Sequence, residues 1–540
     1  MNHIELFAGC GGLSLGLETA GFDLLVANEL SPMASQTFAF NHLNADLADA
    51  KNVEKVYWIS STFKRENLIN RLRENPEIAT GLSDDHSSDI KDNALTNTEL
   101  ERSLLVGSII DLNKLLEQNQ NGLLLKFKSG LGKGEVDLVS GGPPCQSFSL
   151  AGMRDHSNHR NKLPGEFANF VGMVQPRIAL LENVSGILRP FNVDGEKHYA
   201  WFEVAKAFAK KNYVPICIHV NAKYVGTAQN RPRFIMIAIR KDVFERFSTN
   251  LNCEPELMEV LDESKKFFEL SKEVDLKYGC LKYFDVETDD TLFENTILSP
   301  LVEYKTKTED DHSKLVTVKD AIDDLRSNRI PESGYVQRIN SVLKSKFGAE
   351  FDKNANHDLR ANSDKVRARF RLYQLIAKLS PSEAKEIQAF LKTSGETGIS
   401  DNVIAKLTRF WLLDTSGTKL TKPTSKEVFS VLKSLYTKKQ TQRALLADQP
   451  APAALSIPDD ACHYHESLKN QRTLTVREMA RIQSFPDWYK IKSKVTTGGK
   501  MRRFEVPQYT QIGNAVPPLL GLALGKVCAS ILEVVDKNKS

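Results

Sequence analysis

The sequence predicts an α/β protein built on one open sheet, with a second domain inserted late in the chain. Over the first 240 residues, short apolar runs that end in glycine or polar residues alternate with helical patterns, which is typical of α/β folds. That rhythm stops at about residue 241, where charged helical stretches and polar linkers follow. Residues 519–535 form a helix so apolar that it must be buried. We therefore expect this C-terminal helix to pack back on the sheet that begins at residue 4.

The first strand leads into a glycine turn. Residues 4–8 are apolar, and residues 9–12 (Gly-Cys-Gly-Gly) then turn into an amphipathic helix that ends near Gly21. A strand, a glycine turn and a helix form the beginning of a nucleotide-type site, because a helix N-terminus attracts anions. The second strand, residues 24–27, leads to Glu29, which can accept hydrogen bonds from ribose hydroxyls. The alternative is a tight connection of the kind found in any α/β protein.

The strand at residues 136–140 stops abruptly at Gly-Gly-Pro-Pro and leaves Cys145 on a tight turn. In open α/β sheets, ligands and chemistry lie at the carboxyl ends of the strands. Cys145 is therefore either a nucleophile or an inert thiol, and the local sequence does not separate the two. The polar and basic residues 150–163 form either a mobile lid or a solvated loop. Upstream, the irregular residues 45–100 indicate an insertion or peripheral helices, and residues 104–111 another strand that enters a turn.

Charged side chains also end later strands. The strand at residues 176–181 runs into Glu182. Two further strands flank residues 229–233, where Arg231 and Arg233 are separated by one residue. If that segment is extended, both guanidinium groups lie at one edge of the sheet, and arginine suits the recognition of anions and bidentate acceptors. The alternative is a pair of ordinary surface arginines.

The long middle segment predicts a second domain. We place the domain limits at residues 1–240, 241–465 and 466–540, the last part returning to the first domain. Within the middle segment, the arginines of one helical stretch either contact phosphates or line a solvated helix face: Arg367, Arg369 and Arg371.

Composition and charge exclude several classes of protein. The chain has 540 residues, with 72 Lys and Arg against 68 Asp and Glu, and its net charge of +4 permits a polyanionic partner without demanding one. Its seven cysteines include no Cys-x-x-Cys pair, which argues against a disulfide framework or a zinc ribbon and for a reducing compartment. We expect no signal segment, because no basic region followed by an apolar stretch opens the chain. Residues 515–535 contain two prolines and two charged residues, so we expect no membrane span there.

Taken in order, these segments resemble the DNA (cytosine-5-)-methyltransferase family, of the bacterial restriction-modification type. Residues 7–12 (Phe-Ala-Gly-Cys-Gly-Gly) resemble its cofactor motif, and residues 143–146 (Pro-Pro-Cys-Gln) its catalytic motif. Further segments follow in the family's order: residues 182–184, 229–233, 477–486 and 511–518. The resemblance covers about 1–240 and 455–535. It implies a Rossmann-like sheet of the class I S-adenosylmethionine-dependent methyltransferases, with a target-recognition domain at 241–465 inserted before the C-terminal helix.

The resemblance implies a covalent mechanism with four catalytic side chains. The Cys145 thiolate would add to carbon 6 of cytosine, so that carbon 5 becomes reactive enough to take a methyl group from S-adenosylmethionine. Arg231 and Arg233 would lower the pKa of that thiol. A protonated Glu182 would donate a hydrogen bond at nitrogen 3, and Arg233 would hold the oxygen 2 side. A base inside a duplex cannot reach the sulfur, so base flipping is implied as well.

The resemblance also implies contacts to cofactor and substrate, without a metal. Cofactor contacts would come from Phe7, Gly9, Cys10, Gly11, Gly12, Glu29, Ser108, Ile109, Pro143, Leu163, Asn514, Ala515 and Val516. Substrate contacts would come from Gln146, Ser149, Asn183 and Gln229. One position departs from the family pattern, because the chain has Gly-Ser-Ile at residues 107–109 where the family usually has Gly-Asp-Ile. Ser108 is therefore expected to replace only in part the usual aspartate contact to the adenine amino group.

We therefore predict a sequence-specific enzyme that methylates carbon 5 of cytosine in duplex DNA. The expected partners are double-stranded DNA and a cognate restriction endonuclease that acts separately. We expect a monomer in the bacterial cytoplasm, associated with the nucleoid when it is on DNA, and no membrane contact. One alternative is a tRNA cytosine-5 methyltransferase, against which the long recognition segment argues. Another is a non-catalytic DNA-binding regulator, against which the intact Cys145, Glu182 and Arg233 argue.

Overall fold

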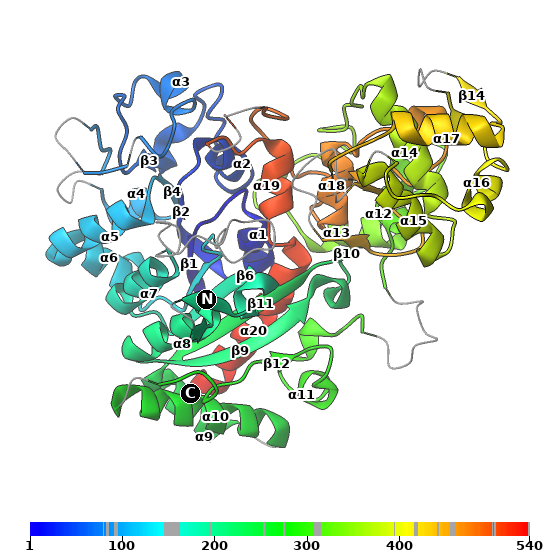
Figure 1. The fold of residues 1–540 in the computed structure, drawn as a ribbon. Coiled ribbons are helices and arrows are strands. Elements are labelled where there is room, and N and C mark those ends of the chain that lie inside the picture. Colours follow the sequence, from blue (N-terminus) through cyan, green and yellow to red (C-terminus); the bar gives the residue numbers. More distant parts are fainter. Residues whose placement is uncertain are drawn as a thin grey trace.

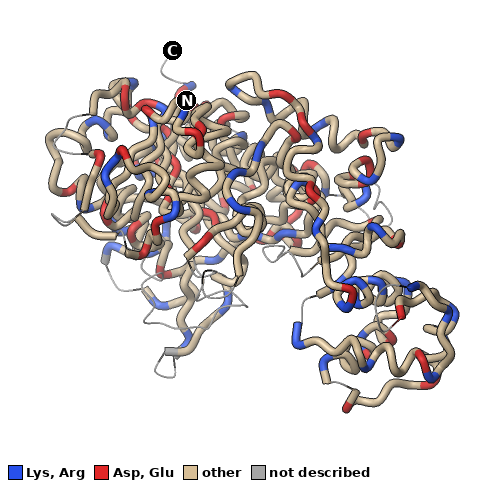
Figure 2. The backbone as a smooth tube through the Cα atoms, turned by 90° about the horizontal axis from the view of Figure 1, so that it is seen from above, with Lys and Arg blue, Asp and Glu red and all other residues tan. Residues whose placement is uncertain are grey.

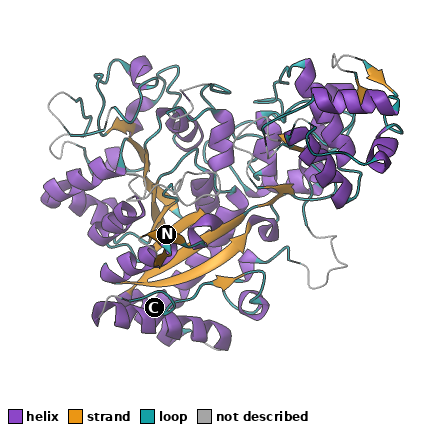
Figure 3. Ribbon diagram, viewed as in Figure 1, coloured by secondary structure: helices purple, strands orange, loops and turns teal. Residues whose placement is uncertain are grey.

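The chain forms a large mixed α/β body and a smaller, mostly helical body in the computed structural model (Figure 1). Most of the strands lie in the large body (Figure 3). The structure describes residues 1–78, 80–82, 86–90, 95–144, 163–193, 196–251, 254–273, 276–305, 315–393, 395–414, 419–439, 442–453, 461–498, 501 and 504–537.

Nine strands form one sheet among the described residues. Their bounds are β1 (Asn2–Leu6), β2 (Asp23–Glu29), β3 (Val56–Trp58), β4 (Ser103–Val106), β5 (Leu138–Gly141), β6 (Ile178–Val184), β9 (Tyr213–Asn221), β11 (Pro232–Arg240) and β12 (Phe284–Asp285). In space they follow the order β12-β9-β11-β6-β5-β1-β2-β4-β3. The strands from β6 to β3 are parallel, whereas β11 is antiparallel to both β6 and β9. The α/β class predicted from the sequence is confirmed.

The order of the strands changes direction at β1, and this decides where a ligand can bind. From β1 the chain passes through α1 (Gly12–Thr19) to β2 on one side, and later through α5 (Ile109–Gln118) to β5 on the other side. Right-handed crossovers place the helices of the two directions on opposite faces of the sheet. Ligands bind outside the carboxyl ends of the strands at such a switch point. Here that point lies between β1 and β5.

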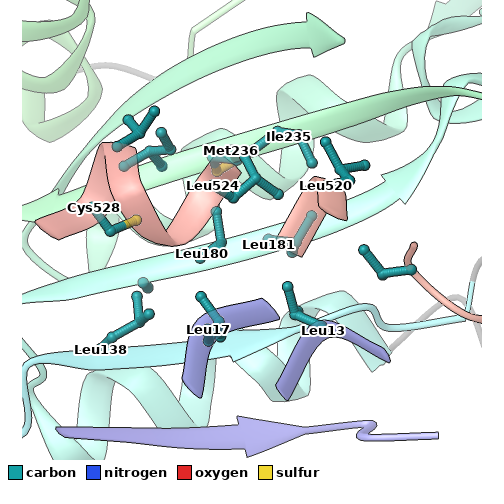
Figure 4. Packing of buried hydrophobic residues seen from close by; sticks show 14 of the residues in the cluster. Leu13, Leu17, Leu138, Leu180, Leu181, Ile235, Met236, Leu520, Leu524 and Cys528 are labelled. Carbon is teal, nitrogen blue, oxygen red and sulfur yellow. The ribbon is translucent and has the colours of Figure 1, made fainter. Parts of the chain in front are cut away.

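The C-terminal helix α20 (Pro518–Asp536) packs against α1 over the strands β5, β6 and β11 (Figure 4). A Cβ atom on Gly16 of α1 would overlap the backbone of Gly521 and Leu522, so the two helices touch closely. In the described part of the chain, the helical stretch Gln508–Asp536 is the one long and apolar enough to cross a membrane, with a mean hydropathy of 1.8. Its apolar window is 78% buried inside the protein, so the expected return of a buried C-terminal helix to the sheet is confirmed.

Part of the segment 45–100 belongs to the main sheet. β3 adds an edge strand parallel to β4, and the short helices α3 (Leu68–Arg71) and α4 (Asn97–Leu100) follow. Arg71 is fully buried, pairs with Asp89 at 2.7 Å and lies over the ring of Trp58. The segment predicted to be an irregular insertion therefore contributes to the main sheet, although residues 79, 83–85 and 91–94 lie outside the described residues.

The segment 241–465 is divided between two hydrophobic cores. Helices α9 (Lys241–Asn250) and α10 (Pro255–Glu273) carry Phe247 and Phe267, which belong to the same apolar cluster as the sheet. β12 even extends the sheet, beside β9. Helices α12 (Val318–Ile322) and α13 (Gly334–Val342) also pack on this core. The packing therefore changes well after residue 241, and the target-recognition role of the segment stays a prediction.

A second core forms the smaller body. It is built from α14 (Asp364–Ile376), α15 (Pro381–Lys392), α16 (Asp401–Leu407) and α17 (Ser425–Ser434), and includes Phe370, Phe390 and Leu432. Capping boxes at Ser380 and Thr424 begin α15 and α17, which satisfies backbone N–H groups that a helix start leaves open.

Two arginines of α14 are structural. Arg369 donates to the carbonyl oxygens of Leu435 and Tyr436. Arg371 donates to the carbonyl oxygen of Trp411 and pairs with Glu466 at 2.7 Å. Both are buried, so neither a phosphate contact nor a solvated helix face, the two alternatives from the sequence, describes them. Their direction follows from packing with segments 40 to 95 residues away in the chain, which local sequence does not encode.

Three of the remaining helices, α2, α7 and α8, belong to the large body, and most of the other remaining elements are short. The helices are α2 (Pro32–His42), α6 (Leu125–Lys128), α7 (Leu163–Val174), α8 (Ala200–Lys210), α11 (Asp290–Glu294), α18 (Val476–Ile482) and α19 (Gln508–Asn514). The strands are β7 (Phe191–Val193), β8 (Glu196–His198), β10 (Gln229–Asn230), β13 (Leu412–Leu413), β14 (Leu420–Thr421), β15 (Arg443–Ala444), β16 (Ala451–Pro452) and β17 (Ala461–Cys462). Of these, β10 pairs with β16, which joins the segment after β9 to the segment after the smaller body.

Replacing Gly16 by alanine tests the contact between α1 and α20. In an open helix, Gly→Ala stabilises by up to about 1 kcal/mol. Here the new methyl group would overlap the α20 backbone, so we expect Gly16→Ala to lower the free energy of unfolding by about 1–3 kcal/mol. At Gly165 of α7 there is open space for a methyl group, and Gly165→Ala should leave stability unchanged or raised. Equal effects of the two substitutions in urea unfolding would contradict the close packing.

Candidate active site

Two turns leave the sheet side by side at the switch point. Strand β5 ends at Gly141, where a Cβ atom would lie 2.6 Å from the carbonyl oxygen of Leu6 at the end of β1. A Cβ atom on Gly142 would lie 2.9 Å from Oε2 of Glu182. These close approaches need glycine. They bring the start of the Pro143-Pro144 turn against both the first strand and the Glu182 carboxylate.

Glu182 and Arg233 meet at the same edge. Because β11 runs antiparallel to β6, residues 233 and 184 are paired, and Arg233 lies beside the end of β6. Its Nε is 2.5 Å from Oε1 of Glu182, and both side chains are almost fully buried. Nδ2 of Asn183 donates to the carbonyl oxygen of Pro143 at 3.0 Å. The predicted residues Glu182, Asn183, Arg233 and Pro143 therefore lie together.

Arg231 points to another part of the site. Its Nη2 donates to the carbonyl oxygens of Gly513 and Ala515, at 2.9 and 3.0 Å. The side chain is buried. A planar guanidinium suits such a fork of two acceptors. Arg231 thus holds the C-terminal motif to the segment before β11, and its predicted action on a thiol stays a prediction.

The glycine turn after β1 is strained and is held by Glu29. Phe7 and Gly9 have φ angles of 55° and 57°, and a positive φ is unusual for phenylalanine. Oε2 of Glu29 accepts from the Gly9 amide at 2.8 Å, and Oε1 accepts from the Ser31 amide at 2.7 Å. Burial raises the pKa of Glu29 above its usual value. A carboxylate has about four acceptor positions, so Glu29 retains capacity for hydroxyl groups of a ligand.

The C-terminal motif covers this turn. A Cβ atom on Gly12 would overlap the carbonyl oxygen of Val516, so only glycine lets the two segments approach. Ala515 and Val516 are buried, whereas Asn514 is exposed. Helix α1 begins at Gly12 without a side-chain cap or an acidic residue in its first turn. The first N–H groups of a helix have no partner within the helix and favour an anion such as a carboxylate or phosphate.

Cys10 of the turn is an inert thiol in this structure. The side chain is buried and donates to the carbonyl oxygen of Gln511 at 3.6 Å. Burial raises the pKa of Cys10 to about 12, so the nucleophilic thiolate is scarce at neutral pH.

The other predicted residues differ in their surroundings. Ser108 caps α5, and its Oγ accepts from the Ile110 amide at 3.2 Å. Ile109 is buried and Leu163 is half-buried at the start of α7. Gln229 is fully buried, and no hydrogen-bond partner for its side-chain amide occurs among the described residues. The predicted residues Cys145, Gln146 and Ser149, and nearly all of the 150–163 loop, lie outside the described residues.

Three residues that sequence reasoning did not assign lie against the turns. Nδ2 of Asn28 donates to the carbonyl oxygens of Leu105 and Gly107, and so joins the ends of β2 and β4. His42 contacts the carbonyl oxygen of Gly11 in the glycine turn, and the Tyr489 hydroxyl donates to the carbonyl oxygen of Cys10. Asn28 could have been suspected, because a polar residue ends an apolar strand. His42 and Tyr489 gave no local signal, since one lies within a helix and the other in a segment about 450 residues away.

A sequence model of the family described as C-5 cytosine-specific DNA methylase matches residues 1–68 and 113–530. The match covers most of the chain and both turns of the site. The chain belongs to this family.

Relatives of this cytosine-5 DNA methylase match nearly its full length. Type II methyltransferase M.DdeI of Desulfomicrobium norvegicum is 25% identical over 531 residues, which are 97% of this chain and 88% of that protein. Type II methyltransferase M.XorII of Xanthomonas oryzae is 23% identical and covers 97% and 83%. Type II methyltransferase M.AgeI of Thalassovita gelatinovora is 24% identical and covers 97% and 98%. The predicted resemblance to DNA cytosine-5 methyltransferases of restriction-modification systems is confirmed.

Cys10 is buried and Cys280 is exposed, so the two thiols of this methylase should differ in reactivity. In mildly alkaline buffer, iodoacetamide should modify Cys280, which is exposed, and leave Cys10 intact, because burial raises the Cys10 pKa to about 12. Unfolding in guanidinium chloride should make Cys10 react as fast as Cys280. Peptide mass spectrometry measures both. Equal labelling of the two thiols in the native protein would contradict the burial of Cys10.

Proposed function

We propose that this methylase transfers a methyl group from S-adenosylmethionine to carbon 5 of cytosine in duplex DNA, through a covalent bond between Cys145 and carbon 6. The observation that carries the proposal is the meeting of three features at one switch point. These are the Gly-Gly-Pro-Pro turn that leads to Cys145, the Glu182–Arg233 pair, and the glycine turn with Glu29. Family membership supports the same chemistry.

Cys145 is the proposed nucleophile. It follows Pro144 directly in the chain, and the turn up to Pro144 leaves the sheet beside β1. The thiolate attacks carbon 6, carbon 5 then accepts the methyl group, and loss of the carbon 5 proton to water releases the cysteine. A thiol is activated by nearby positive charge, and we assign that role to Arg233, whose partner Glu182 lies against Gly142 of this turn.

Glu182 and Arg233 are proposed to bind the cytosine ring. As sulfur adds, negative charge spreads toward nitrogen 3 and oxygen 2. A guanidinium at oxygen 2 and a protonated carboxyl at nitrogen 3 stabilise that charge. Nε of Arg233 lies 2.5 Å from Oε1 of Glu182. An entering cytosine would exchange that contact for two contacts to the ring, which favours a flipped base in a closed pocket.

The glycine turn fits the proposed cofactor. When bound, S-adenosylmethionine supplies an electrophilic methyl group. The open N–H groups at the start of α1 suit its carboxylate, and Glu29 retains acceptor capacity for ribose hydroxyls. A side chain at Gly12 would overlap the Val516 carbonyl, so the C-terminal motif lies directly against this part of the site. Ser108 would contribute a hydroxyl near the adenine.

The smaller body is the proposed DNA reader. Residues 363–444 contain 16 Lys and Arg against 7 Asp and Glu, although the whole chain is nearly balanced. Figure 2 draws these charges along the smaller body, beside the large body. Such an excess favours contact with phosphates, while specificity would come from side chains that reach base edges. Residues 241–305 pack with the sheet, so we limit the proposed recognition body to the second core.

The names of the relatives support a biological setting. They are called type II methyltransferases, and we propose the modification role in a restriction system, with a cognate endonuclease that acts separately. We propose a monomer in the bacterial cytoplasm, where its DNA substrate lies.

The covalent step is tested with duplex DNA that carries 5-fluorocytosine, which cannot release a proton from carbon 5. The wild-type protein with S-adenosylmethionine should form an adduct that survives denaturing electrophoresis, and Cys145→Ala should form none. Cys280→Ala is the matched control, because that thiol is exposed and distant in sequence, and it should form the adduct fully.

Ordinary substrates separate the alternatives in the same assay. Radiolabel should pass to duplex DNA and not to tRNA. Transfer to tRNA alone would replace the substrate, and specific DNA binding without transfer or adduct would indicate a regulator and overturn the proposed enzyme.

A further inference from the structure

The inner side of the glycine turn is held by two side chains from distant segments. Nε2 of His42, at the end of α2, lies 3.1 Å from the carbonyl oxygen of Gly11 and 3.0 Å from the hydroxyl of Tyr489. The Tyr489 hydroxyl donates to the carbonyl oxygen of Cys10. Both side chains are buried. The successive carbonyl oxygens of Cys10 and Gly11 therefore each contact a polar side chain.

These contacts fix the direction of backbone N–H groups. In a trans peptide, a carbonyl group and the following N–H group point in opposite directions. Holding the Cys10 carbonyl thus sets the Gly11 N–H, which donates to the Ala8 carbonyl at 2.9 Å and closes the turn. Holding the Gly11 carbonyl sets the Gly12 N–H, which belongs to the uncapped first turn of α1. Tyr489 therefore acts on the closure of the turn, and His42, together with the Leu15 N–H that donates to the Gly11 carbonyl at 3.0 Å, acts on the Gly12 N–H that the proposed cofactor would meet.

The two side chains leave no room for a side chain at Gly11. Gly11 has a φ angle of 87°, a region that favours glycine. A Cβ atom there would overlap the His42 ring and lie 2.7 Å from the Tyr489 oxygen. The turn is thus pressed against both side chains, and a change in either one should reach its backbone.

His42 is itself held by a buried carboxylate. Its Nδ1 lies 2.8 Å from Oε2 of Glu18, whose Oε1 pairs with Arg102 at 2.6 Å and with Lys346 at 3.3 Å. Burial opposes ionisation of Glu18, but the hydrogen bond and charges of these partners together hold its pKa well below its usual value. The ring of Phe38 stacks on the imidazole with centroids 4.5 Å apart. The imidazole is therefore fixed in orientation on both its edge and its face.

We propose that His42 and Tyr489 are positioning residues for cofactor binding, which act only through the backbone of the glycine turn. The inference rests on the proposed function, because it needs S-adenosylmethionine to bind at this turn. Neither residue contacts the Glu182–Arg233 pair in the described structure. Their loss should weaken cofactor binding and leave the steps on DNA unchanged.

Tyr489→Phe is the most direct test, because it removes one hydroxyl and keeps the buried ring. Losing one oriented hydrogen bond should raise the cofactor Kd about tenfold, measured by calorimetry on the full-length protein. The turnover rate at saturating cofactor and the KM for DNA should stay within about twofold.

His42 is tested by a pair of substitutions. His42→Ala should weaken cofactor binding, and His42→Gln should restore part of it, because a glutamine amide can donate to the Gly11 carbonyl. The effects of His42→Ala and Tyr489→Phe on the free energy of cofactor binding should be less than additive in the double variant, since both side chains hold one turn.

Tyr213→Phe is the matched control for the hydroxyl. Tyr213 is also fully buried, and its hydroxyl donates to the carbonyl oxygen of Pro176 at 2.6 Å, on a strand far from the turn. Tyr213→Phe should lower the Tm about as much as Tyr489→Phe does, but it should leave the cofactor Kd unchanged. If Tyr489→Phe also left the Kd unchanged while the wild type bound the cofactor, the positioning role would be overturned and the proposed function would stand. A wild-type protein that binds no cofactor would overturn both.

Discussion

The site depends on the close approach of β1 and β5 at their carboxyl ends. Gly141 lies so near the Leu6 carbonyl that a side chain there would meet the backbone at 2.6 Å. The two strands leave the sheet into separate turns, one leading to the glycines of residues 9–12 and the other to Pro143 and Pro144. The chain crosses to opposite faces from β1, and ligands of open α/β sheets bind at such a switch point. A methyl donor and an attacking thiol need that adjacency.

The end of the chain completes what its start begins. Helix α20 packs on α1, Val516 lies over Gly12, and Arg231 forks onto the carbonyls of Gly513 and Ala515. The turn that would bind the cofactor is therefore packed against the C-terminal segment of the chain. The second core forms a separate apolar cluster that takes no part in this contact.

Sequence patterns predicted the features that local chemistry dictates. Apolar runs predicted most of the parallel strands, and glycine and proline predicted both turns. The apolar composition of α20 predicted its burial. What they missed depends on long-range packing. The edge strand β3 is only three residues long. The alternation of strands and helices stops after the antiparallel strands β9 and β11, but residues beyond 241 still pack in the core of the sheet. Arg371 turned inward to meet Glu466, and His42 turned to meet Glu18, because distant segments supplied their partners.

Bisulfite sequencing of DNA from cells that express the protein tests the central claim most directly, since methylation at carbon 5 protects cytosine from conversion. We expect one recurring DNA sequence in which the same cytosine stays unconverted with the wild-type protein, and complete conversion with Cys145→Ser. Complete conversion with the active, folded wild type, or equal protection by the Cys145 variant, would contradict transfer to carbon 5 through this cysteine.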